Sequence, residues 1–545
     1  MSKPWREAGR AEACVLHPSH NERRQYSTRT TSSQIHRQTF VRSAGTPSAP
    51  VAPDDGTVAE TTGQEPVPTR RAGRRSAVDP SPTAGETWWQ RHGAVATVSA
   101  WAVSVPVLWL AGALLHYGSN VQLLTGAEPF VGHWVVRTGP GLLAALTLLV
   151  AVVRFGPGLA ARLPWRPLLL VSWVATTAWA VTLAALTSWD DVAAPVRGEH
   201  EYLPAVPIAA ADPAAFLAGF TDDLPDYPIH VRGHPPGLVL LLAQLDRAGL
   251  GGPDWAASLF VLAGASAVPA VLITLRTLSV VRAVGPLHGA ATECTARAVV
   301  PALVLAPAAL WVATSADAFF AGVLAWGVAF LALASDPGRR AAVRWTCAVA
   351  AGLLLGACPI LSYGLLHMGL IALAPLILSR RVAATAVAGV VAVGVVVAFG
   401  LAGFWVWDGV AATHEVWAPV GNMRPYLYFL FVDAAALGAI VGPAAVGGLA
   451  LLRRTDPGTR VVVGLALAAA LSGALLGFER GEVERIWLPV AYWVVPAAVG
   501  LRTWRHDPAG LPADVADRPS DLPVSWLWAQ GGLAILLNTF LESPW

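Results

Sequence analysis

Three carboxylates in the middle of the chain have the type and spacing that proton transfer requires. Asp190 and Asp191 are adjacent and directly follow a long apolar run, and Glu201 lies ten residues after Asp191, next to Tyr202. A carboxylate near an apolar boundary can accept the proton of a hydroxyl group while that hydroxyl attacks an electrophile. We therefore treat Asp190, Asp191 and Glu201 as candidate general bases. For each of them the alternative is an ordinary solvated loop carboxylate.

Four arginines lie close to the ends of apolar runs: Arg232, Arg424, Arg480 and Arg485. A guanidinium is always charged and can grip a phosphate at two points, so these four are candidate phosphate-binding residues. Arg480 and Arg485 belong to residues 479–485, a seven-residue connector with five charges between two apolar runs. A tight turn does not require that charge density. The alternative is that the charges of this connector pair with one another.

Histidines flank one of these arginines. Asp226, His230, Arg232 and His234 form a short polar cluster, D-Y-P-I-H-V-R-G-H. The residue types would suit a divalent cation, but no H-E-x-x-H motif occurs in the sequence. We therefore predict substrate-binding roles for His230 and His234 and assign no metal ligand or cofactor, with a divalent cation as the open alternative.

The composition predicts an integral membrane protein. The chain has 545 residues, of which 55% are hydrophobic and 13% charged, and its mean hydropathy is +0.53. Soluble domains carry about 25% charged residues. Of the 37 basic residues, 13 lie before residue 92, and the net charge is +2, so nucleic-acid binding is not indicated. A single Lys against 36 Arg is typical of a GC-rich bacterial genome of actinobacterial type, and the four cysteines form no C-x-x-C pair.

Thirteen apolar stretches are long enough to be membrane helices, which predicts an all-α fold. They lie near 94–116, 133–153, 167–187, 255–275, 298–314, 318–335, 345–361, 362–379, 383–407, 427–452, 460–478, 487–501 and 526–542. The division of 345–379 into two spans rests on its length, on Pro359 and on the arginines at 380 and 381. Residues 1–90 are predicted to be a disordered basic tail before the membrane domain of residues 91–545.

Charge orients the predicted helices. Alternate loops carry seventeen basic residues on one side and seven on the other, and the second side holds 18 acidic residues against seven. By the positive-inside rule the N-terminus is cytoplasmic, residues 188–254 are outside, and the C-terminus is outside. Within 188–254, His234-Pro235-Pro236-Gly237 precedes an apolar segment of about fourteen residues, which spans only ~21 Å as a helix. We expect that segment to lie at the interface rather than to cross the membrane.

The acidic outer loop and its His234-Pro235-Pro236-Gly237 motif resemble those of the GT-C glycosyltransferases that use polyprenyl-phosphate sugars. This group includes protein O-mannosyltransferases and the aminoarabinose transferases of lipid A. Ser315-Ala316-Asp317 is similar to the Ser/Thr-x-Asp segment that opens a later helix in that group. The resemblance implies a GT-C-like fold, a substrate-binding role for Asp317 and sugar transfer from a polyprenyl-phosphate donor. The acceptor would be an envelope glycan, lipid or protein at the outer face of the cell membrane.

The sequence departs from that group in three respects. The acidic loop follows the third predicted helix rather than the first, and no adjacent Asp-Glu pair is present in it. The motif also ends in Gly237 where the group usually has Leu. The identity of the catalytic carboxylate therefore stays open among Asp190, Asp191 and Glu201.

Two other classes of function are compatible with thirteen helices. A transporter or lipid flippase usually places ionisable groups within its spans, whereas here only His367 and Asp433 lie well inside predicted helices. A scaffold for envelope assembly is the third alternative. No glycine-rich nucleotide motif and no G-x-S-x-G elbow occur, so ATP-driven transport and serine hydrolysis are not indicated.

Overall fold

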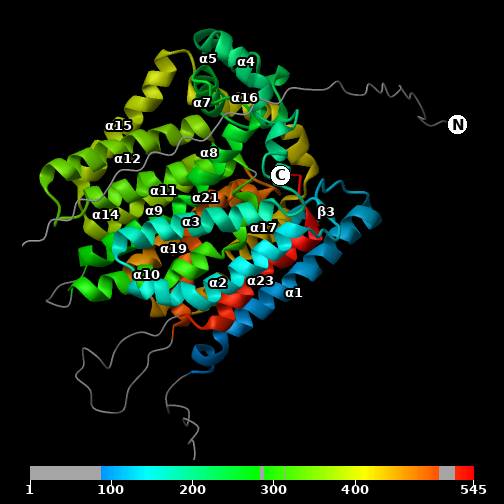
Figure 1. Cartoon of the computed structure of the whole chain (residues 1–545). Helices are drawn as coiled ribbons and strands as arrows, with labels where there is room; N and C mark the ends of the chain where they lie inside the picture. The colour runs from blue at the N-terminus through cyan, green and yellow to red at the C-terminus, as the bar shows by residue number, and fades with distance from the viewer. Residues whose placement is uncertain (1–86, 283–287, 314, 503–521, 545) are drawn as a thin grey trace, which may run out of the picture. The chain divides into compact units, whose positions relative to one another are not determined.

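The chain is an all-α integral membrane protein. The structure, a computed structural model, describes residues 87–282, 288–313, 315–502 and 522–544. The chain divides into two units, Met1–Pro80 and Ser81–Trp545, and the helices described below all belong to the second. Most of the tail that the sequence predicts to be disordered, residues 1–90, lies outside the described ranges. Its last residues are described, and there the first helix begins (Figure 1).

Eight helices in the described part of the chain are long and apolar enough to cross a membrane. They are α1 (Trp88–Ser119), α2 (Pro140–Arg162), α3 (Trp165–Ala184), the joined α8 (Pro253–Ala265) and α9 (Ala267–Arg282), α11 (Ala316–Ala334), α12 (Ala341–Leu361), α15 (Val382–Leu401) and α19 (Pro457–Leu476). Each matches one of the apolar stretches that the sequence predicts. The predicted total of thirteen is not confirmed.

The other predicted spans are short or broken helices. They comprise α10 (His288–Val304) with η5 (Pro307–Trp311), α13 (Leu365–Met368) with η6 (Gly369–Leu373) and α14 (Ala374–Ser379), α17 (Tyr426–Val441) with α18 (Pro443–Ala450), α21 (Leu488–Val494) with η8 (Val495–Leu501), and α23 (Val524–Phe540). The short helix α20 (Val483–Ile486) lies in the connector before α21, outside the predicted spans. Proline explains the sharpest break. Pro443 follows Gly442, whose φ is +84°, and the axes of α17 and α18 differ by 109°.

Close backbone packing joins α12 to α15. Gly352 and Gly356 of α12 lie against Ala388 and Ala392 of α15, and a Cβ at either glycine would collide with the α15 backbone. The two helices are therefore parallel, and residues 362–381 must return to the starting side between them. The need for this return agrees with the predicted division of residues 345–379 into two spans, although the second of these spans is an interrupted helix.

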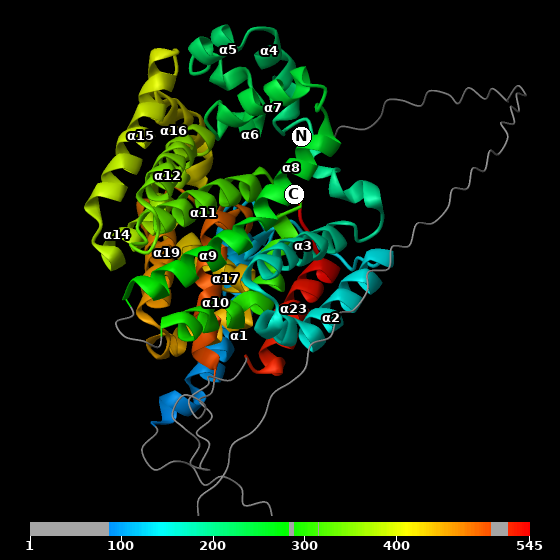
Figure 2. The ribbon, with the colours of Figure 1, turned by 60° about the vertical axis from the view of Figure 1, so that its left-hand side comes forward.

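The large insertion of residues 188–254 folds into short helices at one end of the bundle. These are η1 (Trp189–Val192), η2 (Pro195–Arg197), η3 (Leu203–Ala205), α4 (Val206–Ala211), α5 (Pro213–Gly219), η4 (Leu224–Asp226), α6 (Ile229–Arg232) and α7 (Gly237–Arg247). Figure 2 shows α4, α5, α6 and α7 together with α16 (Val406–Met423) in its upper part. As predicted, the apolar segment after Gly237 is an eleven-residue helix, too short to cross a membrane.

Two small antiparallel strand pairs lie beside α1 and α23. β1 (Gly126–Ala127) pairs with β2 (Phe130–Val131), and β3 (His133–Trp134) pairs with β4 (Leu541–Glu542). The pairing of β3 with β4 continues in two more bonds, in which the backbone N–H groups of Val135 and Arg137 donate to the carbonyls of Phe540 and Thr539. Residues 120–137 are thus fixed to the segment after α23.

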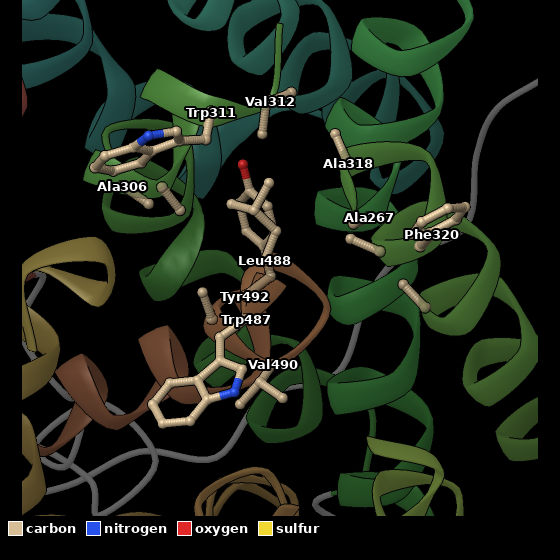
Figure 3. Close-up of a cluster of buried hydrophobic side chains, with 14 of the residues drawn as sticks. Ala267, Ala306, Trp311, Val312, Ala318, Phe320, Trp487, Leu488, Val490 and Tyr492 are labelled. Atoms are coloured by element: carbon tan, nitrogen blue, oxygen red, sulfur yellow. The ribbon is translucent and has the colours of Figure 1, made fainter. Parts of the chain in front are cut away.

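Aromatic side chains fill the core under this end of the bundle. Trp311, Trp487 and Tyr492 are each at most 2% exposed. In Figure 3 they lie with Leu488 among small residues of α9, α11 and the segment before η5. Large rings beside alanines allow helices of different tilt to pack without voids. This core packs against the start of α11 and the connector of residues 479–485.

We predict that residues 188–254 face the outside of the cell. In a variant without its four native cysteines, Cys introduced at Ile208, which is 55% exposed, should react with a membrane-impermeant maleimide in intact cells. Cys introduced at the exposed Arg340, at the opposite end of α11, should react only after permeabilisation. The reverse labelling pattern would invert the topology and contradict the outward orientation.

Candidate functional site

A small pocket opens where the insertion of residues 188–254 meets the start of α11. Its lining residues come from four distant parts of the sequence: Glu201, Tyr202, His230, Ser315, Ala316, Asp317 and Arg485. Glu201 and Tyr202 precede η3, His230 lies on α6, and Arg485 lies on α20. Four residues that the sequence singled out, Glu201, His230, Asp317 and Arg485, therefore meet in one place.

A buried ion network forms one wall of this pocket. Nη1 of Arg485 lies 2.8 Å from Oδ2 of Asp317, and its Nη2 lies 2.9 Å from Oε2 of Glu482. The Arg485 and Asp317 side chains are 8% and 4% exposed. Burial alone would lower the pKa of Arg485, but the carboxylates of Asp317 and Glu482 outweigh it and raise that pKa above its ordinary value. Arg485 is a fixed cation.

The start of α11 holds Asp317 in place. Ser315 is the N-cap of α11: its Oγ accepts the backbone N–H of Asp317 at 3.1 Å and donates to Oδ2 of the same residue at 2.8 Å. A carboxylate in the first turn of a helix also faces the positive end of the helix dipole. Asp317 is thus fixed by its own helix and by Arg485.

The opposite wall carries a carboxylate and imidazole pair. Nδ1 of His230 lies 2.7 Å from Oε1 of Glu201, and both side chains are 14% exposed. The backbone N–H of His230 donates to the carbonyl of His200 at 3.0 Å, which fixes α6 to the turn before Glu201. Glu201 is therefore a held carboxylate that still borders the pocket.

His234 lies behind the pocket in an aromatic cage. Its ring centroid is 5.7 Å from that of Tyr202 and 5.6 Å from that of Phe320. Burial lowers the pKa of His234 to about 4, against the opposing effect of Asp317. Since its Nδ1 lies 2.8 Å from the carbonyl oxygen of His230, which can only accept, Nδ1 carries the proton. His234 supports α6 from inside as a neutral imidazole.

The other two predicted bases lie away from this pocket. The carboxylate of Asp191 accepts hydrogen bonds from the backbone and side chains of Thr187 and Ser188 and caps η1. Burial alone would raise the pKa of Asp191, but these bonds together outweigh it and lower that pKa to about 2. Asp190 is exposed. Neither residue lines the pocket that contains Glu201.

Three of the four predicted phosphate-binding arginines also lie outside the pocket lining. Arg424 donates to the carbonyl of Arg480 and lies 3.3 Å from Oε1 of Glu482. Arg480 in turn donates to the carbonyl of Gly421 at 2.7 Å. These two arginines fasten the connector to the end of α16.

Arg232 contacts α16 at another point. Its carbonyl accepts a hydrogen bond from Thr413 of α16 at 3.1 Å, and the Nε of Arg232 is buried without a partner among the described residues.

Three acidic residues, two in the connector and one on α17, are buried although their charge suggests exposure. Oε1 of Glu484 accepts the backbone N–H of Val131 at 3.0 Å, and Oε2 of Glu479 accepts Nε1 of Trp487 at 2.5 Å. Oδ1 of Asp433 accepts the backbone N–H of Gly481 at 3.0 Å. Burial raises the pKa values of Glu479 and Glu484 to about 7. Each carboxyl therefore has a structural contact with a neighbouring element.

Sequence reasoning did not assign Tyr202, Ser315 and Glu482 to the site. Ser315 carries a recognisable signal, since Ser two residues before Asp at the start of an apolar run is typical of an N-cap. Glu482 has none beyond its charge, because its φ of +63° and its bonds to two arginines depend on the folded connector. Among the described residues no group of three His, Cys, Asp or Glu side chains is arranged to hold a metal ion.

We predict that Glu484 makes the stability of the protein fall as the pH rises. An unfolded Glu has a pKa near 4.5, whereas the pKa of folded Glu484 is about 7, so the folded state binds more protons between these values. The contribution of Glu484 to the free energy of unfolding is fully present below pH 4.5 and is lost as the pH rises through 7. Glu484→Gln keeps an acceptor for Val131 and should stabilise the protein at pH 8, by at most about 3 kcal/mol, and less at pH 5.

The measurement is the thermal unfolding midpoint of the detergent-purified full chain at pH 5 and pH 8. Glu415→Gln, on the exposed Glu415 of α16, is the matched control and should change neither midpoint. An equal shift at both pH values in Glu484→Gln would contradict the predicted titration.

No protein-family model and no curated protein matches the chain. Among solved structures the chain is similar to ArnT from Cupriavidus metallidurans in the apo state, with 16% sequence identity and a TM-score of 0.36. The match covers 56% of this chain and 54% of that chain, so the chain spans about half the length of that protein.

Proposed function

We propose that this protein is a membrane glycosyltransferase of the GT-C type. In this proposal it moves a sugar from a polyprenyl-phosphate donor to an envelope glycan, lipid or protein acceptor at the membrane face that bears the pocket. The observation that carries the proposal is the meeting of Glu201, His230 and Arg485 around one pocket at the end of a membrane helix. A lipid-linked donor keeps its phosphate at headgroup depth, and the first turn of α11, at the end of a helix long enough to cross a membrane, is expected near that depth.

Glu201 is the proposed general base. It takes the proton of the acceptor hydroxyl while that oxygen attacks the anomeric carbon, and the bond from this carbon to the phosphate oxygen breaks with its electron pair leaving on the phosphate. His230, 2.7 Å from the carboxylate, orients Glu201. Asp317 is less suited to accept this proton because it is already paired with Arg485 and bonded to Ser315.

Arg485 is the proposed contact for the departing phosphate, because a guanidinium fixed at the pocket wall can stabilise developing negative charge. Its two carboxylate partners reduce the net positive charge available to a phosphate, so its role needs a test separate from that of Glu201. Arg232, Arg424 and Arg480 are proposed to support the walls of the site. The transporter alternative is less well supported, because the ion pairs of the described residues lie toward the two ends of the bundle rather than along a path through it.

We predict that Glu201→Gln lowers turnover about 10²–10⁴-fold, the usual contribution of a general base. Turnover is measured in membranes with a panel of polyprenyl-phosphate-linked hexoses and pentoses. Asp190→Asn and Asp191→Asn are the matched controls and should stay within a few-fold of the parent, because neither residue lines the pocket. Normal turnover in Glu201→Gln would remove this residue as the base and lead to Asp317 as the next candidate.

We predict that Arg485→Lys weakens the apparent affinity for the donor by roughly tenfold or more while the protein still accumulates in the membrane. Lysine keeps the positive charge but cannot contact Asp317, Glu482 and a phosphate in the same geometry. The readout is the concentration of donor that gives half-maximal turnover, beside membrane abundance. Arg197→Lys, at an exposed arginine of the outer insertion, is the control. An unchanged half-maximal concentration in Arg485→Ala would leave Arg485 with a structural role alone.

A further inference from the structure

A second cavity, of about 180 Å³, lies far from the pocket of Glu201. Its lining comes from the end of α11 and the beginnings of α12 and α15: Ala334, Arg344, Trp345, Arg381, Val382, Ala383 and Ala384. Ala334 is the last residue of α11, and Asp317 of the first pocket lies at the start of the same helix. A nineteen-residue helix is about 28 Å long, close to the thickness of the hydrocarbon core. The cavity therefore lies at the opposite membrane boundary.

The segment around this cavity carries a large excess of positive charge. Between residues 318 and 407 the sequence has five arginines, at 339, 340, 344, 380 and 381, and a single acidic residue, Asp336. Oδ2 of Asp336 lies 3.2 Å from Nε of Arg339. In the described part of the chain, neither Arg344 nor Arg381 has a carboxylate within 4.0 Å. Two cationic side chains thus border the cavity without an acidic residue to neutralise them.

The backbone adds to this positive field. α12 and α15 both begin at the cavity, and their N-cap residues, Arg340 and Arg381, make no capping bond through their side chains. The N–H groups of a first helical turn have no partner within the helix, and the helix dipole places partial positive charge there. Ala383 and Ala384 of the first turn of α15 line the cavity. An anion there would meet two guanidinium groups and the positive ends of two helices.

An apolar surface continues from the cavity along the membrane. Val382 is 67% exposed, and Val390 and Val393 are 74% and 62% exposed. At spacings of eight and eleven residues they lie on one side of α15. Trp345, which is 41% exposed, borders the cavity from α12. α12 and α15 run side by side at the edge of the bundle in Figure 2.

We propose that this cavity binds the phosphate headgroup of an anionic membrane phospholipid, whose acyl chains lie along the exposed face of α15. The two arginines and the helix N-termini recognise the phosphodiester, and Trp345 packs at the interface, where indole rings are favoured. A free phosphate would gain the polar contacts but leave the apolar face of α15 uncovered. The site is separate from the proposed glycosyl transfer.

The experiment measures lipid binding to the purified full chain in an uncharged detergent. The probe is phosphatidylglycerol with a fluorescent acyl chain, and phosphatidylcholine with the same chains is the uncharged comparison. Arg344→Ala with Arg381→Ala should weaken phosphatidylglycerol binding roughly 30-fold, from about fivefold for each arginine near a membrane surface. Arg162→Ala with Arg166→Ala removes the same charge from exposed positions at the end of α2 and the start of α3 and should change binding less than twofold.

Two further measurements separate the explanations. Arg344→Lys with Arg381→Lys keeps the charge and should retain most of the binding, which shows that loss in the alanine variant does not arise from misfolding. Inorganic phosphate alone, titrated calorimetrically, should give no comparable binding. Equal binding of the two lipids, equal loss in the Arg162 and Arg166 control, or inorganic phosphate binding as tightly as phosphatidylglycerol would each overturn the proposal.

Discussion

The ion pair between Arg485 and Asp317 joins parts of the chain that are 168 residues apart. Both groups are almost completely removed from solvent. Removing Arg485 would leave the buried carboxylate of Asp317 without its cation, and such a loss typically costs about 3–5 kcal/mol, whereas Arg485 also has Glu482 as a partner. The connector that carries Arg485 is therefore tied to the start of α11, and this contact fixes one wall of the pocket.

Secondary contacts extend from this pair in both directions along the connector. Glu482 contacts Arg485 on one side and Arg424 on the other, so that the end of α16 and the start of α11 are held by one carboxylate. Glu484, on the next turn, reaches β2 through the N–H of Val131. A connector of a few residues thus holds three segments that the sequence separates widely. Of the five charges in residues 479–485, Arg485 and Glu482 pair with each other, as in the alternative left open by the sequence. Glu479, Arg480 and Glu484 instead bond to Trp487, Gly421 and Val131, outside the connector.

The apolar pattern of the sequence predicts most of the long helices because hydrophobicity over about 20 residues is a local property. It predicts the breaks poorly. The bend at Gly442 and the interruption of 362–379 depend on neighbouring helices that satisfy the freed backbone groups. The site shows the same division: the Ser315-x-Asp317 signal and the charge of Arg485 are visible in the sequence, whereas the choice of Glu201 over Asp191 as a pocket residue is not. Asp191 is used to cap η1, and nothing in its spacing distinguishes a capping carboxylate from a pocket carboxylate.

The pairing of β3 with β4 sets an order for assembly. Residues 133–137 can complete their backbone hydrogen bonds only after residues 539–542 exist, and Asn538 must also reach the carbonyl of Leu183 at the end of α3. Helices α1 to α3 enter the membrane hundreds of residues earlier during synthesis. The backbone groups of residues 133–137 therefore lack these hydrogen-bond partners while the rest of the bundle is inserted. The late pairing of segments so far apart in the sequence is a long-range closure of the kind that slows folding.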